Sequence, residues 1–365
     1  MTETLSDILR RRIEIHGPLR LDLFMGEALT GYYRTRQPLG REGDFVTAPE
    51  ITSLFGEMLG LWCVDTWEKV GRPDRFLLVE PGPGRGTLMA DILRTMDRVS
   101  PECRRACQIH LVEISPLLRS LQQKALEDKD NISWHETLET VPEGPAILVA
   151  NEFFDALPVR QLCRTATGWS EVHVGYTAEQ GFHLVTDPRP SVAVALVPEN
   201  LRSAPEGTVV EISPASWSIM QDLARRLKRN RGAALVIDYG HDSPRSGATL
   251  QALRNHQKVS APGSPGECDL TAHVDFAALS RVAREEGVRT VGPVGQGEFL
   301  EALGIGARAQ QVAAKLSDTK KKQLEQSVER LVHPDAMGQL FRVLGVASPD
   351  LKGLAGFPGA GEKVL

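Results

Sequence analysis

The sequence is poor in cysteine, and its few cysteines follow no regular pattern. There are five in 365 residues. An odd number without a repeated spacing predicts reduced thiols in a cytoplasm-like compartment and argues against a disulfide framework. Cys103 and Cys107 lie four positions apart, but no second pair of cysteines or histidines accompanies them. We therefore expect no metal site.

The sequence also lacks an excess of basic residues and any long apolar run. Its formal net charge is −5, which argues against binding to duplex nucleic acid, because such binding needs a basic face. No apolar run approaches the length that spans a membrane. The first residues, MTETLSD, have neither an apolar signal core nor the Arg-rich composition of a transit peptide. These features predict a soluble, cytoplasmic protein with no nucleic-acid partner and no membrane insertion.

The stretch from residue 76 to residue 94 organises the rest of the chain. Residues 76–79 are continuously apolar, which is typical of a strand buried on both faces of a parallel sheet. A glycine-rich turn, EPGPGRG, follows at 80–86, and apolar residues then recur at helical spacing. This order of strand, turn and helix predicts the first unit of a doubly wound α/β domain. Its ligand is expected at the carboxyl end of the strand.

Glu80, which ends this strand, indicates what the glycines hold. A carboxylate would repel a pyrophosphate bound at the start of the following helix. It would attract S-adenosylmethionine (SAM), which carries an ammonium and a sulfonium. An acid followed by Gly82, Gly84 and Gly86 therefore favours a SAM site. An NAD-dependent oxidoreductase and a purely structural turn are the alternatives.

Polar residues also end the later predicted strands. Glu113 ends the second strand, where an acid accepts hydrogen bonds from ribose hydroxyls in this class of fold. Asn151, Glu152 and Asp155 follow the strand at 145–150, so the same rule directs them to the ligand crevice. A substrate-facing role is favoured there, and a salt-bridged turn is the alternative.

Three regions are expected in the chain. Residues 1–75 form an N-terminal helical region, in which the loop-like segment 31–45 is either a lid or a packed Ω-loop. Residues 76–350 form the main domain. It has a β-hairpin insertion at about 160–205 and a mobile, Gly- and Pro-rich insertion at about 243–275. The tail at 351–365 is expected to fray. Thr47 and Glu50 have the spacing of a capping box that begins a helix.

Six runs of residues together resemble one family. They are GYY at 31–33, GDFVTAPEI at 43–51, EPGPGRGT at 80–87, NEFFDALP at 151–158, DYGH at 238–241 and DLTAHVDF at 269–276. Over nearly its whole length the chain is similar to the MidA-type methyltransferases, whose mitochondrial branch assists assembly of respiratory complex I. The resemblance implies an α/β, class I SAM-dependent methyltransferase fold. This is Rossmann-like, with a seven-stranded, mostly parallel sheet, an N-terminal helical cap and a β-hairpin insertion.

The resemblance also implies the positions of the cofactor and of the acceptor. The residues expected to bind SAM are Glu80, Gly82, Gly84, Gly86, Glu113, Asn151, Phe45 and Thr47. The residues expected at the acceptor are Glu152 and Asp155, with Asp238 as a further catalytic candidate and His241 as a weaker one. The implied activity is methylation of arginine on a protein, with a respiratory complex I subunit as the partner.

An arginine acceptor would bring two cations together. At about 4 Å and an effective dielectric near 20, a guanidinium and a sulfonium repel each other by roughly 4 kcal/mol. Glu152 and Asp155 are the expected clamp and proton acceptor. Better-known arginine methyltransferases use two glutamates in the corresponding loop, so this chain departs from them. A SAM-binding assembly factor without activity and a small-molecule methyltransferase are the alternative functions.

Overall fold

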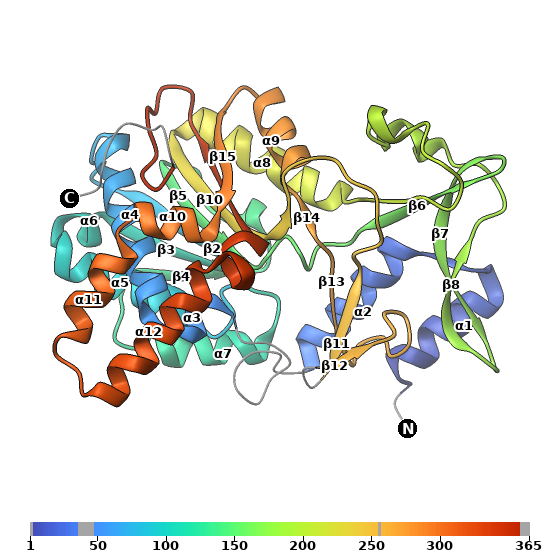
Figure 1. Cartoon of the computed structure of the whole chain (residues 1–365), viewed down its shortest axis with the longest axis horizontal. Helices are drawn as coiled ribbons and strands as arrows, with labels where there is room; N and C mark the ends of the chain where they lie inside the picture. The colour runs from blue at the N-terminus through green and yellow to red at the C-terminus, as the bar shows by residue number, and fades with distance from the viewer. Residues whose placement is uncertain (1–2, 36–46, 255–256, 358–365) are drawn as a thin grey trace.

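A twisted central sheet forms the core of the protein. The computed structural model describes residues 3–35, 47–254 and 257–357. The strands of the sheet follow the order β15-β16-β10-β5-β2-β3-β4 (Figure 1). Their bounds are β2 Phe76–Pro81, β3 Cys107–Val112, β4 Ile132–His135, β5 Ala146–Asn151, β10 Gly232–His241, β15 Arg289–Gly295 and β16 Phe341–Ala347. Only β16 runs against its neighbours on this path. The predicted mostly parallel sheet is therefore confirmed. Beside the seven strands of this path it has an eighth, the short β14 (Val274–Asp275), which pairs with the end of β10.

Helices cover both faces of this sheet, because its strands are apolar on both sides. Along β2 the side chains alternate between two cores: Leu78 packs in one, and Leu77 and Val79 pack in the other. Helices α4 (Ser53–Val70) and α5 (Thr87–Val99) contribute to the first core, while α8 (Pro214–Asn230) and α9 (Phe276–Glu285) contribute to the second. The other helices of this part are α3 Ala48–Ile51, α6 Pro101–Ala106, α7 Pro116–Ala125, α10 Gln296–Ala302, α11 Ile305–Ala313 and α12 Asp318–Val332.

A second lobe lies beside the central sheet and has its own core (Figure 1). Its antiparallel sheet has the order β1-β7-β6-β9, with β8 paired to β7. These strands are β1 Leu19–Arg20, β6 Arg160–Thr165, β7 Gly168–Thr177, β8 Gly181–Thr186 and β9 Val209–Ile212. Helices α1 (Leu5–His16) and α2 (Leu21–Thr35) pack on this lobe. A small sheet of β11 (Gln251–Arg254), β12 (Gln257–Val259) and β13 (Asp269–Thr271) adjoins it.

The structure corrects several boundaries. The N-terminal 75 residues are not one unit, because α1 and α2 join the second lobe whereas α4 packs on the central sheet. The β-hairpin insertion extends to β9 and is part of a five-stranded sheet. The Gly- and Pro-rich insertion contains β11 to β13, which the period-two pattern was too short to reveal.

Two segments are more ordered than the sequence indicated. Tyr32 and Tyr33 lie in α2 and not in a loop, because packing of the fully buried Tyr32 outweighs the weak helix propensity of Gly31. Residues 351–357 do not fray. Phe357 is buried, and its ring centroid lies 5.3 Å from that of Phe299.

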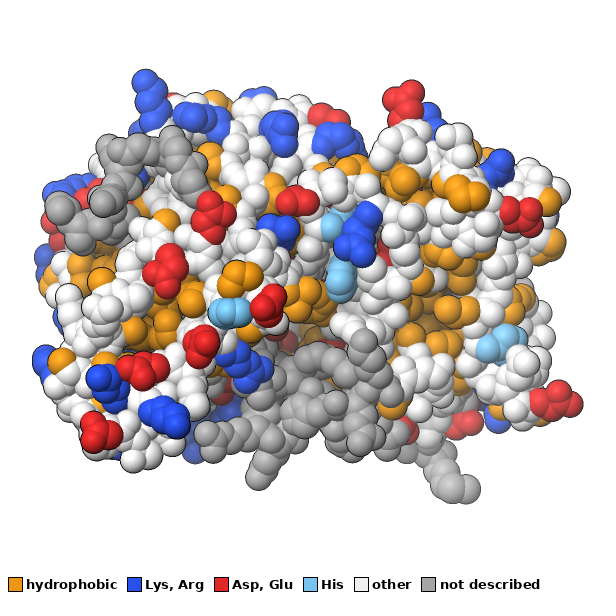
Figure 2. Space-filling view, viewed as in Figure 1, with side chains coloured by type: hydrophobic (Ala, Val, Ile, Leu, Met, Phe, Trp, Pro, Cys, Tyr) orange, Lys and Arg blue, Asp and Glu red, His pale blue; other side chains and the backbone are white. Residues whose placement is uncertain are grey.

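The visible surface carries charges of both signs. Basic and acidic side chains alternate over the face shown in Figure 2, without an extended basic area. This distribution agrees with the net charge of −5. Within the described ranges, no helix is both long enough and apolar enough to span a bilayer.

Candidate active site

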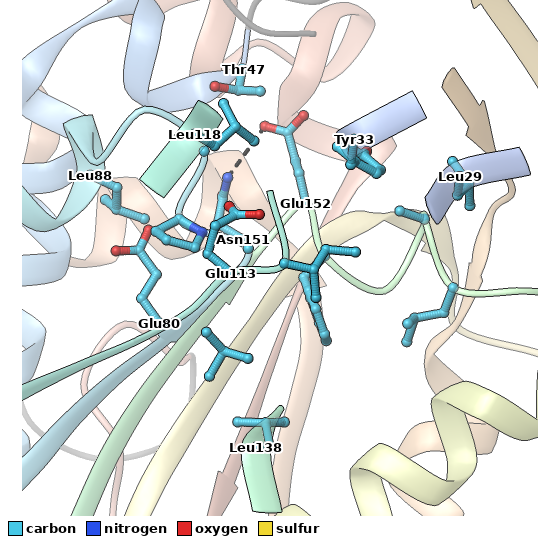
Figure 3. A pocket seen from close by; sticks show the side chains of 18 of the residues that line it. Leu29, Tyr33, Thr47, Glu80, Leu88, Glu113, Leu118, Leu138, Asn151 and Glu152 are labelled. Carbon is cyan, nitrogen blue, oxygen red and sulfur yellow. Dashed lines mark hydrogen bonds between the residues drawn. The ribbon is translucent and has the colours of Figure 1, made fainter. Parts of the chain in front are cut away.

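A cavity of about 490 Å³ lies at the carboxyl ends of β2, β3 and β5. Two ends can be distinguished on either side of Glu152 (Figure 3). Glu80, Leu88 and Glu113 lie on one side, which we name the donor end. Leu29 and Tyr33 of α2 lie on the other side, which we name the acceptor end. The cavity therefore occupies the crevice that the parallel-strand rule predicts, and both lobes line it.

Glu80 places an unsatisfied carboxyl group at the donor end. The residue is 3% exposed, and its Oε2 has no hydrogen-bond partner among the described residues. Burial raises the pKa of Glu80 to about 8. A buried, unpaired acid is costly, and a cationic ligand group would both satisfy it and favour its charged form. Glu80 therefore fits an ammonium.

The glycine turn has a backbone conformation that residues with side chains rarely adopt. Gly82, Gly84 and Gly86 have φ angles of 62°, 55° and 83°, in the left-handed region that glycine adopts without steric cost. A Cβ atom on Gly82 would lie 3.1 Å from Cδ2 of Phe153, and one on Gly86 would lie 3.3 Å from Cα of Gln122. The turn thus presents backbone to the cavity, as a close-fitting ligand loop requires.

Gln122 links this turn to Glu113, which follows β3, through two hydrogen bonds. Its Nε2 donates to Oε2 of Glu113 at 3.0 Å and to the carbonyl oxygen of Gly84 at 2.8 Å. The backbone N–H of Ser115 donates to Oε1 of Glu113 at 2.7 Å. Burial raises the pKa of Glu113. Sequence analysis missed Gln122, since a glutamine inside a helix carries no distinctive signal.

Glu152 stands between the two ends of the cavity with one oxygen anchored. Its φ of 50° is rare for a residue other than glycine and marks local strain. Its Oε1 accepts from the backbone N–H of Ala48 at 3.2 Å and from Nδ2 of Asn151 at 3.3 Å. Burial, reinforced by the charge of Asp155, raises the pKa of Glu152 to about 8. Asn151 is 9% exposed, and its Oδ1 has no partner among the described residues.

Asp155 and Asp238 lie behind the cavity wall. Neither is among the described residues that line the cavity. Asp155 accepts from the hydroxyl of Tyr239 at 2.6 Å, and burial raises its pKa to about 6. Asp238 is fully buried and accepts from the backbone N–H groups of Phe154, Asp155 and Tyr239. The structure therefore does not bring these two acids to the acceptor beside Glu152. Asp238 instead holds the loop that carries Glu152.

The other predicted residues have mixed outcomes. Thr47 lines the cavity, but its side chain does not cap α3, and Glu50 accepts from Oγ1 of Thr87 at 2.6 Å. The predicted capping box is therefore wrong. Phe45 lies outside the described residues. His241 does not line the cavity in the described part of the chain, and its Nδ1 lies 2.8 Å from the carbonyl oxygen of Ser243. No three described His, Cys, Asp or Glu side chains are grouped to hold a metal ion.

The acceptor end is mainly apolar. Leu29 of α2 lies there, and Gly26, Leu157 and Ile219 also line the cavity. The hydroxyl of Tyr33 donates to Asp269 at 3.1 Å, and burial raises the pKa of Tyr33. These α2 residues were missed as binding residues because the segments that they meet lie far away in the sequence.

Comparison with known proteins identifies relatives of the whole chain. A family model described as "Putative S-adenosyl-L-methionine-dependent methyltransferase" matches residues 58–294. "Protein arginine methyltransferase NDUFAF7, mitochondrial" from Danio rerio is 36% identical over 365 residues, covering 93% of this chain and 85% of that protein. The Homo sapiens protein of the same name is 35% identical over 362 residues, covering 91% and 81%.

Solved structures show the same architecture. A Burkholderia thailandensis protein crystallised with S-adenosyl-homocysteine has a TM-score of 0.83 to this chain at 27% identity, with 96% of this chain and 93% of that chain covered. A native crystal structure from the same organism has a TM-score of 0.80 at 28% identity, with 97% and 94% covered. This coverage extends over both lobes, so the second lobe belongs to the shared architecture.

Proposed function

The chain belongs to this family of S-adenosyl-L-methionine-dependent methyltransferases, and we propose that it methylates an arginine side chain of a protein. The names of the Danio rerio and Homo sapiens relatives support this acceptor. The observation that carries the proposal is the position of Glu152, a half-buried acid with one anchored oxygen between the donor and acceptor ends.

The donor end fits SAM. Glu80 would accept from the ammonium, the glycine turn would present backbone N–H groups, and Glu113 would accept from the ribose hydroxyls. When bound, SAM supplies an electrophilic methyl group on a positively charged sulfur. No metal is needed for this transfer, because the leaving group departs as a neutral thioether.

The acceptor end fits the side chain of arginine. Its aliphatic stem would pack against Leu29 and Leu157, and its guanidinium would reach Glu152. The negative charge of Glu152 would offset the repulsion between guanidinium and sulfonium, which is roughly 4 kcal/mol at about 4 Å. Arginine keeps its proton until the transfer, so a base is needed afterwards. Glu152, whose burial raises its pKa to about 8, is suited to take that proton.

The natural acceptor is part of the proposal. We propose a subunit of respiratory complex I, because the chain resembles the MidA-type family, whose mitochondrial branch assists assembly of that complex. We also propose that the protein is located in the cytoplasm.

Mass spectrometry tests the activity. Arginine methylation would be compared in cells with and without the gene, and the affected proteins would then be incubated with purified enzyme and methyl-labelled SAM. We expect arginine sites that lose methylation in the cells and regain it in vitro. If purified enzyme labels another residue type or a small molecule, the arginine proposal is wrong. If it binds SAM and labels nothing, the assembly-factor alternative is favoured.

A further inference from the structure

The side-chain amide of Asn151 connects the two ends of the cavity. Its Nδ2 donates to Oε1 of Glu152 at 3.3 Å, and its Oδ1 makes no hydrogen bond to the described residues (Figure 3). Asn151 is 9% exposed and lines the cavity. A buried carbonyl oxygen of this kind needs a donor, and no described protein group supplies one.

The orientation of the amide follows from its neighbours. An ionised carboxylate only accepts hydrogen bonds, so when Glu152 is ionised the NH2 group of Asn151 faces Glu152 and the oxygen of Asn151 faces the cavity. Leu78 and Val149 pack in the same core, so Glu80 and Asn151, two positions further along their adjacent strands, point to that same side of the sheet. Both residues carry an unpartnered buried oxygen. Two such acceptors together suit one cationic donor group.

We propose that the Asn151 amide couples cofactor binding to the charge of Glu152. Its Oδ1 accepts from the ammonium of the cofactor, which fixes the amide with its NH2 group toward Glu152. That NH2 group then donates to Glu152 as a carboxylate, because an ionised acceptor forms the stronger bond. Asn151 is thus a positioning residue, and the enzyme acquires its acceptor-binding charge when the donor is present.

The other groups around Glu152 define its starting state. The charge of Asp155 on the same loop opposes the ionisation of Glu152. Burial, which is the largest cause, and then the charges of Asp155 and Glu152 raise the pKa of Asp238 on β10. The N–H of Ala48, the Asn151 amide and the positive charge of Arg330 on α12 favour ionisation. Burial is the largest influence and raises the pKa of Glu152 to about 8. Near pH 7 Glu152 is therefore mostly protonated before the cofactor binds.

Linkage is reciprocal, so binding of the cofactor must release the proton of Glu152. The test is calorimetric titration with S-adenosylhomocysteine, which carries the ammonium and has no methyl group to transfer. Titrations at pH 7 in buffers of different ionisation enthalpy give the number of protons released. The variants are Glu152→Gln, Asn151→Ala and the double variant, with Glu80→Gln as the control for protons that come from Glu80.

We expect Glu152→Gln, Asn151→Ala and the double variant to lower proton release by the same amount, up to about one proton. Glu80→Gln should lower it separately. If Asn151→Ala releases as many protons as the wild type, Glu152 responds to the cofactor without the amide, and the inference is wrong. It is also wrong if Glu152→Gln leaves proton release unchanged.

A second measurement covers the case in which Asn151→Ala does not fold or bind. The slope of log Kd against pH between pH 6 and 8 should be shallower in Glu152→Gln than in the wild type, because glutamine has no proton to lose. An equal slope would contradict the coupling. The inference rests on the proposed function for the acceptor role of Glu152, but neither measurement uses an acceptor. If cofactor binding releases the proton of Glu152 but the enzyme methylates no arginine, the proposed function is wrong and the inference stands.

Discussion

The donor and acceptor ends of the cavity are built in different ways. The donor end consists of strand ends and a glycine turn within one sheet, and its key groups, Glu80 and Glu113, lie close together in the chain. The acceptor end takes one wall from α2 of the second lobe, and its Tyr33 bonds to Asp269, 236 residues away. The donor end is thus local and polar, whereas the acceptor end is assembled from distant, mostly apolar segments. Glu152 lies between the two ends. Replacing its carboxylate should therefore show most clearly which property depends on which end.

Glu152→Gln should have the largest effect. The amide keeps the shape but cannot offset the positive charge of a guanidinium, so turnover with an arginine acceptor should fall by about 100-fold or more. The affinity for SAM should change far less, by less than about tenfold. Initial rates with a labelled methyl donor and calorimetric titration measure the two quantities. The exposed Glu127→Gln serves as the control, and normal turnover of Glu152→Gln would remove Glu152 from the mechanism.

Glu80→Gln should weaken SAM binding without changing the acceptor end. Loss of a charge-assisted hydrogen bond is worth about 1.5–3 kcal/mol, so the Kd for SAM should rise by about 10- to 100-fold. At saturating SAM, turnover should stay near the wild-type value, because the acceptor end is unchanged. A fall in turnover without a change in Kd would show that Glu80 acts in the methyl transfer and not in binding SAM.

Gly26 offers a change confined to the acceptor end. A Cβ atom there would lie 3.5 Å from Cγ of Pro158, an ordinary contact, so Gly26→Ala should fold and give a slightly more stable α2. Gly26→Leu extends further and should narrow the cavity. We expect its KM for the protein acceptor to rise by roughly tenfold while the Kd for SAM stays constant. Equal KM values for the two variants would place the acceptor elsewhere.

The two ends should also contribute to the pH dependence of stability. Burial raises the pKa of Glu80 and of Glu152 to about 8, so without ligand each group stays protonated in the folded state while it ionises in the unfolded chain. The free energy of unfolding should therefore fall as pH rises from about 4.5 to 8, by up to about 1.4 kcal/mol per pH unit for each group. Denaturant unfolding of the ligand-free protein at several pH values measures this slope. Glu80→Gln and Glu152→Gln should each flatten it; an unchanged slope in both would contradict the raised pKa values.

Tyr33→Phe should have the smallest effect. It removes one hydrogen bond to Asp269 and should cost about 1 kcal/mol in the free energy of unfolding, with no change in the affinity for SAM. Thermal unfolding and calorimetry would show whether Tyr33 belongs to the acceptor end only. A clear loss of SAM affinity would mean that α2 also shapes the donor end.

The contrast between the ends explains what the sequence could predict. The strand, glycine turn and helix around Glu80 are adjacent in sequence, so local patterns predicted the fold and the position of the donor end. The roles of Asp155 and Asp238 could not be predicted in the same way. Asp155 follows β5, whose end lies at the cavity, and Asp238 lies within the neighbouring strand β10. Both side chains instead accept hydrogen bonds away from the cavity, from Tyr239 or from backbone N–H groups. Side-chain direction depends on tertiary partners, which periodicity does not show.

The position of α2 bears on how the acceptor specificity of this enzyme could change. The helix packs in the separate core of the second lobe, and its Leu29 and Tyr33 lie at the acceptor end of the cavity. Substitutions in that lobe can therefore change which protein binds as the acceptor, while the donor end of the cavity keeps its structure. Acceptor selection and methyl-donor binding can thus be altered separately, because they depend on different lobes.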